Sequence, residues 1–243
     1  MTDRPRILVP IRVLQGESIP EGVPELLANA HVVLLGYHVV PDQTATGQAK
    51  LQFEERANKR LEKYGSILED AGATVERRLV FTHDGQKTLD RISDKDDCLA
   101  VLVPNGTRPP ADVLVAVRGT ASVSRIARVV AGLFSSTSVS VTLYHVTETN
   151  ETDDDIQTFF DGVRSRLTAL GMDPSAIDTQ IDPEAKRLGA IAAAAEEYDA
   201  LVMGESDPSL ATFVFGMPGE QIADRFNGPV LVVQREPPNP ESS

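Results

Sequence analysis

The sequence has 243 residues, a formal net charge of -13 and 41% hydrophobic residues. This hydrophobic content is ordinary for a globular protein, and the length allows one large domain or two small ones. The negative charge disfavours non-specific binding to nucleic acid or anionic lipid. No apolar run approaches the roughly 18 residues that a membrane-spanning helix needs. We therefore expect a cytoplasmic protein that binds no nucleic acid and has no direct membrane insertion.

Strands and helices alternate through the first half of the chain. Nearly continuous apolar runs predict buried strands at residues 6–11, 32–40 and 99–103, and a strand with one polar face is predicted at 74–81. Apolar residues at helical spacing predict helices at 20–30, 49–71 and 84–93. The only cysteine, Cys98, precedes the last of these strands, where a buried thiol acting as a small hydrophobic side chain is expected.

The same order then restarts and continues one helix and one strand further. Strands are predicted at 113–117, 139–146, 177–181, 200–203 and 230–233, and helices at 123–134, 153–170, 184–198 and 218–226. The motif Tyr-His-Val occurs in both halves, and the halves repeat with an offset of about 106 residues, which indicates a tandem duplication.

The predicted fold class is α/β, because alternating strands and helices form parallel sheets with right-handed crossovers. We expect two tandem open parallel-sheet, Rossmann-like, three-layer domains, of which the first lacks its last helix and strand. The predicted boundaries are a truncated domain at 1–109, a complete domain at 110–236 and a disordered tail at 237–243.

Several short motifs of the second half resemble the domains of the universal stress protein family. They lie at residues 113–120, 143–146, 199–204, 215–223 and 228–233. The resemblance implies an open five-stranded sheet of the adenine-nucleotide alpha hydrolase type, often paired through its last strand. It also implies a cytoplasmic, stress-linked or regulatory role. Some members of this family bind ATP and others do not.

The ATP-binding members of this family have an Asp after the first strand. The resemblance implies that this Asp holds the nucleoside part of ATP. Here Arg118, followed by Gly119, stands at that position, and Arg12 does so in the first half. Either arginine could supply a cation to a phosphate or another anion from the wall of the crevice. The alternative is an arginine paired with local acids such as Glu205 or Asp207.

The family's phosphate loop reads Gly-x2-Gly-x9-Gly-Ser/Thr, in which backbone N–H groups and a hydroxyl approach the phosphate. The present loop keeps Gly204 and Gly216, but Asp207 occupies the second glycine position and Met217 replaces the hydroxyl residue. No Lys or Arg occurs from residue 204 to 224. We therefore predict a vestigial site with lost or weak ATP binding and no cofactor. Its residues are Arg118, Gly119, Gly204, Gly216 and Met217.

The last predicted strand is expected at the edge of the sheet, and an exposed apolar edge favours pairing with another strand. Its residues are Val230, Leu231, Val232 and Val233. We predict a homodimer through this strand, with the alternative that it pairs with the open edge of the first half inside the monomer.

No set of side chains in the sequence indicates a catalytic residue or a metal site. His38 and His145 occupy equivalent strand positions in different halves, which favours structural histidines over metal ligands or acid–base groups. The chain has no Gly-x-Ser-x-Gly motif, no P-loop Gly-Lys-Ser/Thr and no Cys-x-x-Cys. We predict a stress-response regulator that acts by association with an unknown protein partner and is not an enzyme. The alternative is a nucleotide- or small-anion-binding sensor that uses the second-half crevice and could regulate a membrane transporter.

Overall fold

The computed structural model describes residues 3–43, 45–106, 108–119, 122–148, 151–183, 187–205 and 226–235. The first half contains β1 (Arg6–Ile11), α1 (Val23–Leu26), β2 (His31–Val39), α2 (Thr46–Asp70), β3 (Thr74–Thr82), α3 (Gly85–Lys95) and β4 (Ala100–Val103). The second half contains β5 (Asp112–Ala116), α4 (Val123–Phe134), β6 (Ser140–Val146), α5 (Asp153–Ala169), a 3-10 turn (Pro174–Ala176), β7 (Ile177–Asp182), α6 (Arg187–Ala195), β8 (Ala200–Gly204) and β9 (Val230–Val233). The predicted tail at 237–243, and all but the last residue of the predicted helix at 218–226, lie outside the described residues.

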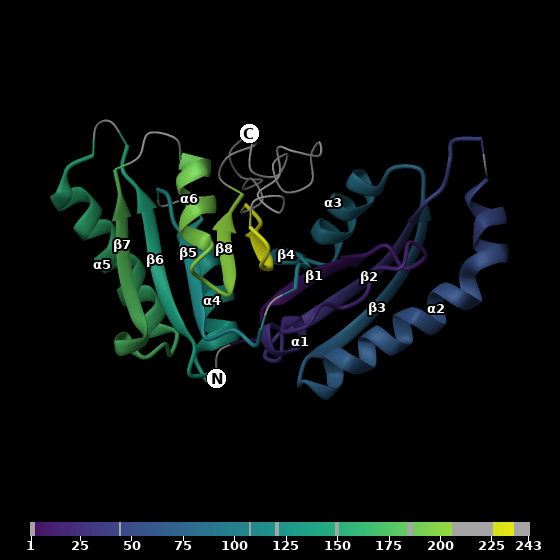
Figure 1. The fold of residues 1–243 in the computed structure, drawn as a ribbon, viewed down its shortest axis with the longest axis horizontal. Helices are drawn as coiled ribbons and strands as arrows, with labels where there is room; N and C mark the ends of the chain where they lie inside the picture. The colour runs from purple at the N-terminus through teal and green to yellow at the C-terminus, as the bar shows by residue number, and fades with distance from the viewer. Residues whose placement is uncertain are drawn as a thin grey trace, which may run out of the picture.

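The strands form one continuous sheet of nine strands in the order β3-β2-β1-β4-β9-β8-β5-β6-β7 (Figure 1). Each half has the strand order of a doubly wound α/β sheet, which confirms the predicted fold class. The halves share one sheet because β9 pairs in parallel with β8 and antiparallel with β4. The strand that the first half lacks is thus supplied by the last strand of the second half.

The prediction that Val230–Val233 is an edge strand is wrong. Leu231, for example, is in register with Leu102 of β4 on one side and with Val202 of β8 on the other. The predicted homodimer through this strand would need a free edge, and β4 occupies that edge. The alternative of pairing inside the monomer describes the structure.

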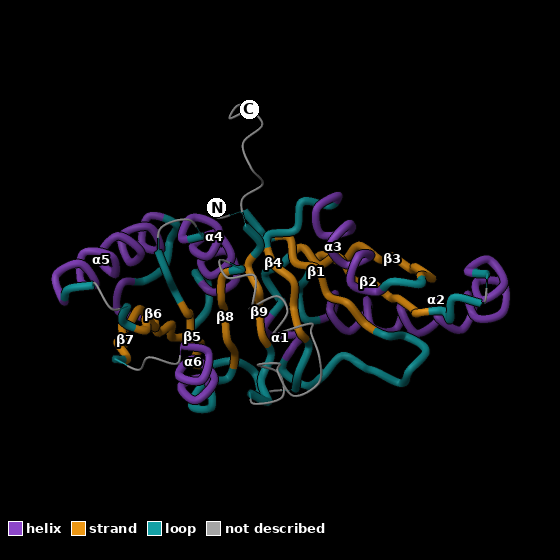
Figure 2. Tube along the Cα trace, turned by 90° about the horizontal axis from the view of Figure 1, so that it is seen from above, coloured by secondary structure: helices purple, strands orange, loops and turns teal. Residues whose placement is uncertain are grey.

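Helices cover both faces of the sheet and complete a three-layer architecture. The largest core cluster joins one face to α1, α2, α4 and α5. On the other face, α3 packs on the first half and α6 on the second. In Figure 2 the α4 and α5 side is uppermost at the left, whereas α2 lies lowermost at the right, because the sheet twists between the two halves.

Local sequence explains where two of the helices begin. α5 begins with a capping box in which the Thr152 side chain accepts from the Asp155 N–H and the Asp155 side chain accepts from the Thr152 N–H. α1 is shorter than predicted, because Gly22 precedes it with φ of 80° and Leu27 already leaves helical geometry.

The segment between the two halves is fixed by Asp199, a carboxylate that is 5% exposed. Its oxygens accept hydrogen bonds from Arg108 Nε at 2.6 Å, from the Ala111 N–H at 2.8 Å and from the Asp112 N–H at 3.1 Å. Burial alone would raise the pKa of Asp199, but these donors outweigh it and hold the pKa below its usual value. The connection thus depends on an ionised carboxylate.

The Asp199→Asn variant should unfold more easily than the wild type by about 2 kcal/mol near neutral pH, because a neutral amide has one acceptor oxygen for three donors that now bond two carboxylate oxygens. The lowered pKa of Asp199 means that its stabilisation is present above the unfolded-state pKa and is lost as the pH falls through the folded-state pKa. Urea unfolding should therefore show the difference between wild type and variant shrinking on acidification. The exposed Asp178→Asn control on β7 should change stability by less than about 0.5 kcal/mol. A pH-independent loss in Asp199→Asn would contradict this account.

The pairing of β9 also predicts a monomer in solution. The two outer strands of the sheet carry charged side chains along their length, among them Glu76 and Arg78 on β3 and Asp178 and Asp182 on β7, which discourages edge-to-edge pairing. Size-exclusion chromatography with light scattering should give a mass near 26.2 kDa. A stable species of twice that mass would show that another surface of the chain self-associates.

Candidate functional site

The candidate site lies at the carboxyl ends of β5 and β8, where the strand order of the second half reverses. Ligands of open α/β sheets bind at this kind of position. β5 leads into Arg118 and Gly119, β8 ends at Gly204, and α4 begins nearby at Val123. The fold therefore brings Arg118, Gly119 and Gly204 to the same end of the sheet, as the sequence predicts. Gly216, Met217 and Asp207 lie outside the described residues.

Gly204 has a packing role that does not involve phosphate. A Cβ at this position would lie 3.1 Å from the Cβ and 3.3 Å from the Oγ of Ser122, the residue that precedes α4. A side chain here would need Ser122 or the end of β8 to shift by a few tenths of an ångström. The close approach of strand and helix thus favours a glycine here, whether or not a ligand binds.

Arg118 pairs with an acid that the sequence analysis did not name. Its Nε forms an ion pair with Glu148 Oε1, beyond the end of β6. β6 borders β5 on the side opposite β8, so this contact draws the guanidinium away from the loop that begins at Gly204. In the first half, the Arg12 side chain also contacts the neighbouring second strand: its Nε donates to the Tyr37 hydroxyl of β2 at 3.0 Å.

A hydrogen-bond network around the buried His145 holds the loop that carries Glu148. The Glu151 carboxylate accepts from the Glu148 N–H at 2.7 Å and contacts His145 Nε2 at 2.7 Å. His145 is 2% exposed, and its Nδ1 lies 3.1 Å from the Val117 carbonyl oxygen. Burial would raise the pKa of Glu151, but the hydrogen bonds from His145 and Glu148 outweigh it and lower the pKa. These contacts give His145 the structural role that the sequence predicts.

Glu205 places a carboxylate directly after Gly204. Its N–H donates to the Val233 carbonyl oxygen at 2.8 Å, and its own carbonyl oxygen accepts from Arg235 Nε at 2.6 Å. Partial burial raises the pKa of Glu205, the nearby Arg235 lowers it, and the acids Asp90 and Asp94 of α3 raise it further. The first residue of the loop therefore carries a carboxylate, whose negative charge is unfavourable for a phosphate close to it.

Sequence reasoning missed Glu148 and Glu151 as partners at this site. A signal was available: both follow β6, whose carboxyl end must lie beside that of β5 in this strand order. The position of Glu148 two residues beyond the strand places it beside Arg118. Side-chain pairing across neighbouring strand ends therefore has to be considered together with the loop itself.

The described residues contain no group of three or more His, Cys, Asp or Glu side chains arranged to hold a metal ion. Cys98 is buried, and burial together with nearby acids raises the pKa of its thiol to about 12, as expected for an unreactive structural cysteine. Among the described helices, none combines the length and the apolar character needed to cross a bilayer.

Comparison with solved structures identifies the class of fold as that of the universal stress proteins. A universal stress protein from Archaeoglobus fulgidus DSM 4304 matches with a TM-score of 0.65 and 16% identity, over 96% of this chain and 97% of that chain. A protein from Pseudomonas aeruginosa UCBPP-PA14, assigned to the universal stress proteins, matches with a TM-score of 0.51 and 15% identity, over 96% of this chain and 94% of that chain.

Neither protein-family models nor curated protein sequences give a match. The structural matches have low sequence identity and extend over almost the whole chain. The chain therefore has the universal stress protein fold, with both halves included in the likeness.

Replacing Glu205 by Gln should stabilise the protein near pH 7 by up to about 1 kcal/mol, because the variant removes a charge that partial burial disfavours. The raised pKa of Glu205 means that its unfavourable ionisation grows as the pH rises through the folded-state pKa. Urea unfolding should thus show the largest gain at neutral pH and a smaller gain at acidic pH. Glu197→Gln, on an exposed position, is the control. A variant less stable than wild type at neutral pH would contradict the role given to Glu205.

Proposed function

We propose that this chain is a regulatory, stress-response protein of the universal stress protein type that acts in the cytoplasm through association with other proteins. It binds ATP weakly or not at all and is not an enzyme. The observation that carries the proposal is the ion pair between Arg118 and Glu148. This contact gives Arg118, the cation that follows β5, a carboxylate partner from the side of β6.

The surroundings of Gly204 support the same proposal. Glu205 follows it with a raised pKa, and the acids of α3 lie close enough to contribute to that rise. A nucleotide phosphate in this position meets negative charge, and the repulsion between exposed like charges about 4 Å apart is roughly 1 to 4 kcal/mol. Such an energy corresponds to a loss of affinity of about tenfold or more. A protein of this fold that binds no nucleotide would act by binding other proteins at its surface.

Isothermal titration of the intact protein with ATP and Mg²⁺ tests the proposal. We expect no binding stronger than the millimolar range, because Arg118 is held by Glu148 and Glu205 repels phosphate. An ATP-binding universal stress protein titrated in the same buffer serves as the positive control. Micromolar binding to the second-half crevice would overturn the proposal and favour a nucleotide-sensing role.

A further inference from the structure

The charges on α2 are sorted onto different flanks of the helix. On the flank that faces β3, Glu62 and Glu69 pair with Arg77 at 3.4 Å and 2.7 Å. The other flank carries Arg56 and Lys63, both exposed, for which no ion pair within 4.0 Å exists among the described residues. In a chain with a net charge of -13, unpaired cations on one flank of a helix are unexpected.

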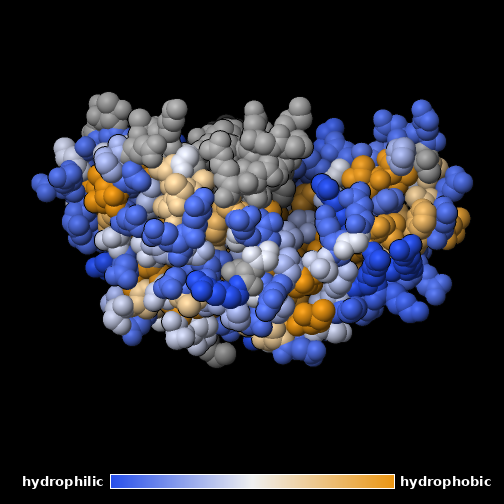
Figure 3. Space-filling view, viewed as in Figure 1, coloured by the Kyte–Doolittle hydropathy of each residue, from blue (hydrophilic) through white to orange (hydrophobic). Residues whose placement is uncertain are grey.

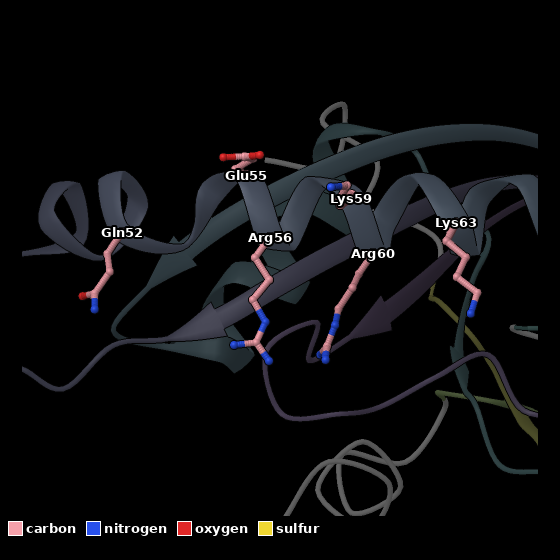
Figure 4. A pocket seen from close by; sticks show the side chains of 6 residues that line it. All are labelled: Gln52, Glu55, Arg56, Lys59, Arg60 and Lys63. Atoms are coloured by element: carbon pink, nitrogen blue, oxygen red, sulfur yellow. The ribbon is translucent and has the colours of Figure 1, made fainter.

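These cations border a groove with a volume of about 580 Å³. Its lining residues are Gln52, Glu55, Arg56, Lys59, Arg60 and Lys63. Figure 4 shows Gln52, Arg56, Arg60 and Lys63 extending from α2 to the same side, with Glu55 on the opposite side of the helix. Figure 3 shows strongly hydrophilic residues over the part of α2 that this view exposes. The groove is therefore lined by four cations and one acid, and three of the cations extend to the side opposite the acid.

One member of this set is fixed in place by the fold. Arg60 Nη1 donates to the Val13 carbonyl oxygen at 2.6 Å, and Tyr64 one turn later donates to the Glu17 carbonyl oxygen at 2.6 Å. These bonds tie α2 to the loop after β1, so that Arg60 has a defined position while its other N–H groups can serve a ligand. Arg56 and Lys63 flank it at helical spacing, and the three positions extend over about 10 Å along the axis.

The second half shows that the fold does not require these cations. The buried positions Ala57, Leu61, Tyr64 and Leu68 of α2 have the same spacing as Ile156, Phe160, Val163 and Leu167 of α5. On this alignment the counterparts of Arg56, Arg60 and Lys63 are Asp155, Phe159 and Gly162. Both helices pack on the same face of the sheet with equivalent apolar stripes. The cationic flank is thus a property of the first half alone, beyond what packing demands.

We propose that the groove along α2 binds a small multivalent oxyanion, either a linked-phosphate compound or a polycarboxylate. Arg side chains match the geometry of both phosphate and carboxylate oxygens, and a row of cations favours an anion whose charges are spread along its length. A long nucleic acid is disfavoured, since it would extend beyond the groove over a surface of the same charge sign. The site is separate from the second-half crevice and does not depend on the proposed function.

Titration calorimetry of the intact protein with tripolyphosphate, citrate and orthophosphate tests this site. Tripolyphosphate or citrate should bind more tightly than orthophosphate, and binding should weaken when the salt is raised to about 0.2 M, because the contacts are exposed and screened. The variant Arg56→Gln/Lys63→Gln should lose about tenfold or more in affinity for whichever multivalent anion binds. Arg60 is left unchanged because it also anchors the loop after β1.

The matched control is Lys87→Gln/Lys95→Gln, which removes the same charge from α3 on the other face of the sheet. It should change the affinity by less than about twofold, and both variants should keep the wild-type unfolding temperature. Equal affinity of the α2 variant and wild type, or no preference for multivalent anions, would overturn the proposal. If the α2 variant abolishes ATP binding, that binding takes place in the groove. If micromolar ATP binding survives in the variant, it takes place elsewhere and contradicts the proposed function, not the groove proposal.

Discussion

The architecture depends on one short strand that is hydrogen-bonded on both edges. β9 has four residues, all buried, and each is in register with a residue of β4. Without it the sheet would divide into two pieces, each with an exposed apolar edge of the kind that promotes aggregation. Pairing one strand with both halves removes the two edges together, and leaves as outer strands β3 and β7, which carry charged residues.

The direction of β9 also fixes how the halves face each other. Because it runs parallel to β8 and antiparallel to β4, the strands of the first half run opposite to those of the second. The carboxyl ends of the two sets of strands therefore lie at opposite ends of the sheet. The position after β1 and the position after β5 cannot combine into one site. Arg12 contacts Tyr37 and Arg118 contacts Glu148, each within its own half.

Most of the fold could be predicted from the sequence because it depends on apolar periodicity, which is local. The strand at 230–233 was predicted with its observed bounds, and the stripes of α2 and α5 follow from helical spacing. The neighbours of β9 could not be predicted, since an apolar strand pairs equally well with a second chain or with another part of its own. That choice depends on the three-dimensional position of β4.

The site was less predictable, because the motif positions were identifiable but their partners were not. Arg118 was identified as a departure from the nucleotide-binding pattern, yet the sequence did not indicate its ion pair with Glu148 in the loop after β6. Gly204 fits the motif, but the close approach of Ser122 favours a glycine there for packing alone. A glycine shared with a binding motif is therefore weak evidence for binding when a helix packs against the same position.

The duplication offers a stronger criterion than motif matching, because the two halves meet the same packing requirements with different sequences. Features present in both, such as the apolar stripes that cover the sheet, are explained by the fold. Features present in only one need another cause. In the second half, Phe159 packs 5.7 Å from the ring of His145, whereas its counterpart Arg60 donates to the loop after β1. Equivalent positions thus belong to an aromatic cluster in one half and to a cationic flank in the other. The two halves keep the same backbone arrangement but differ in side-chain chemistry at this position.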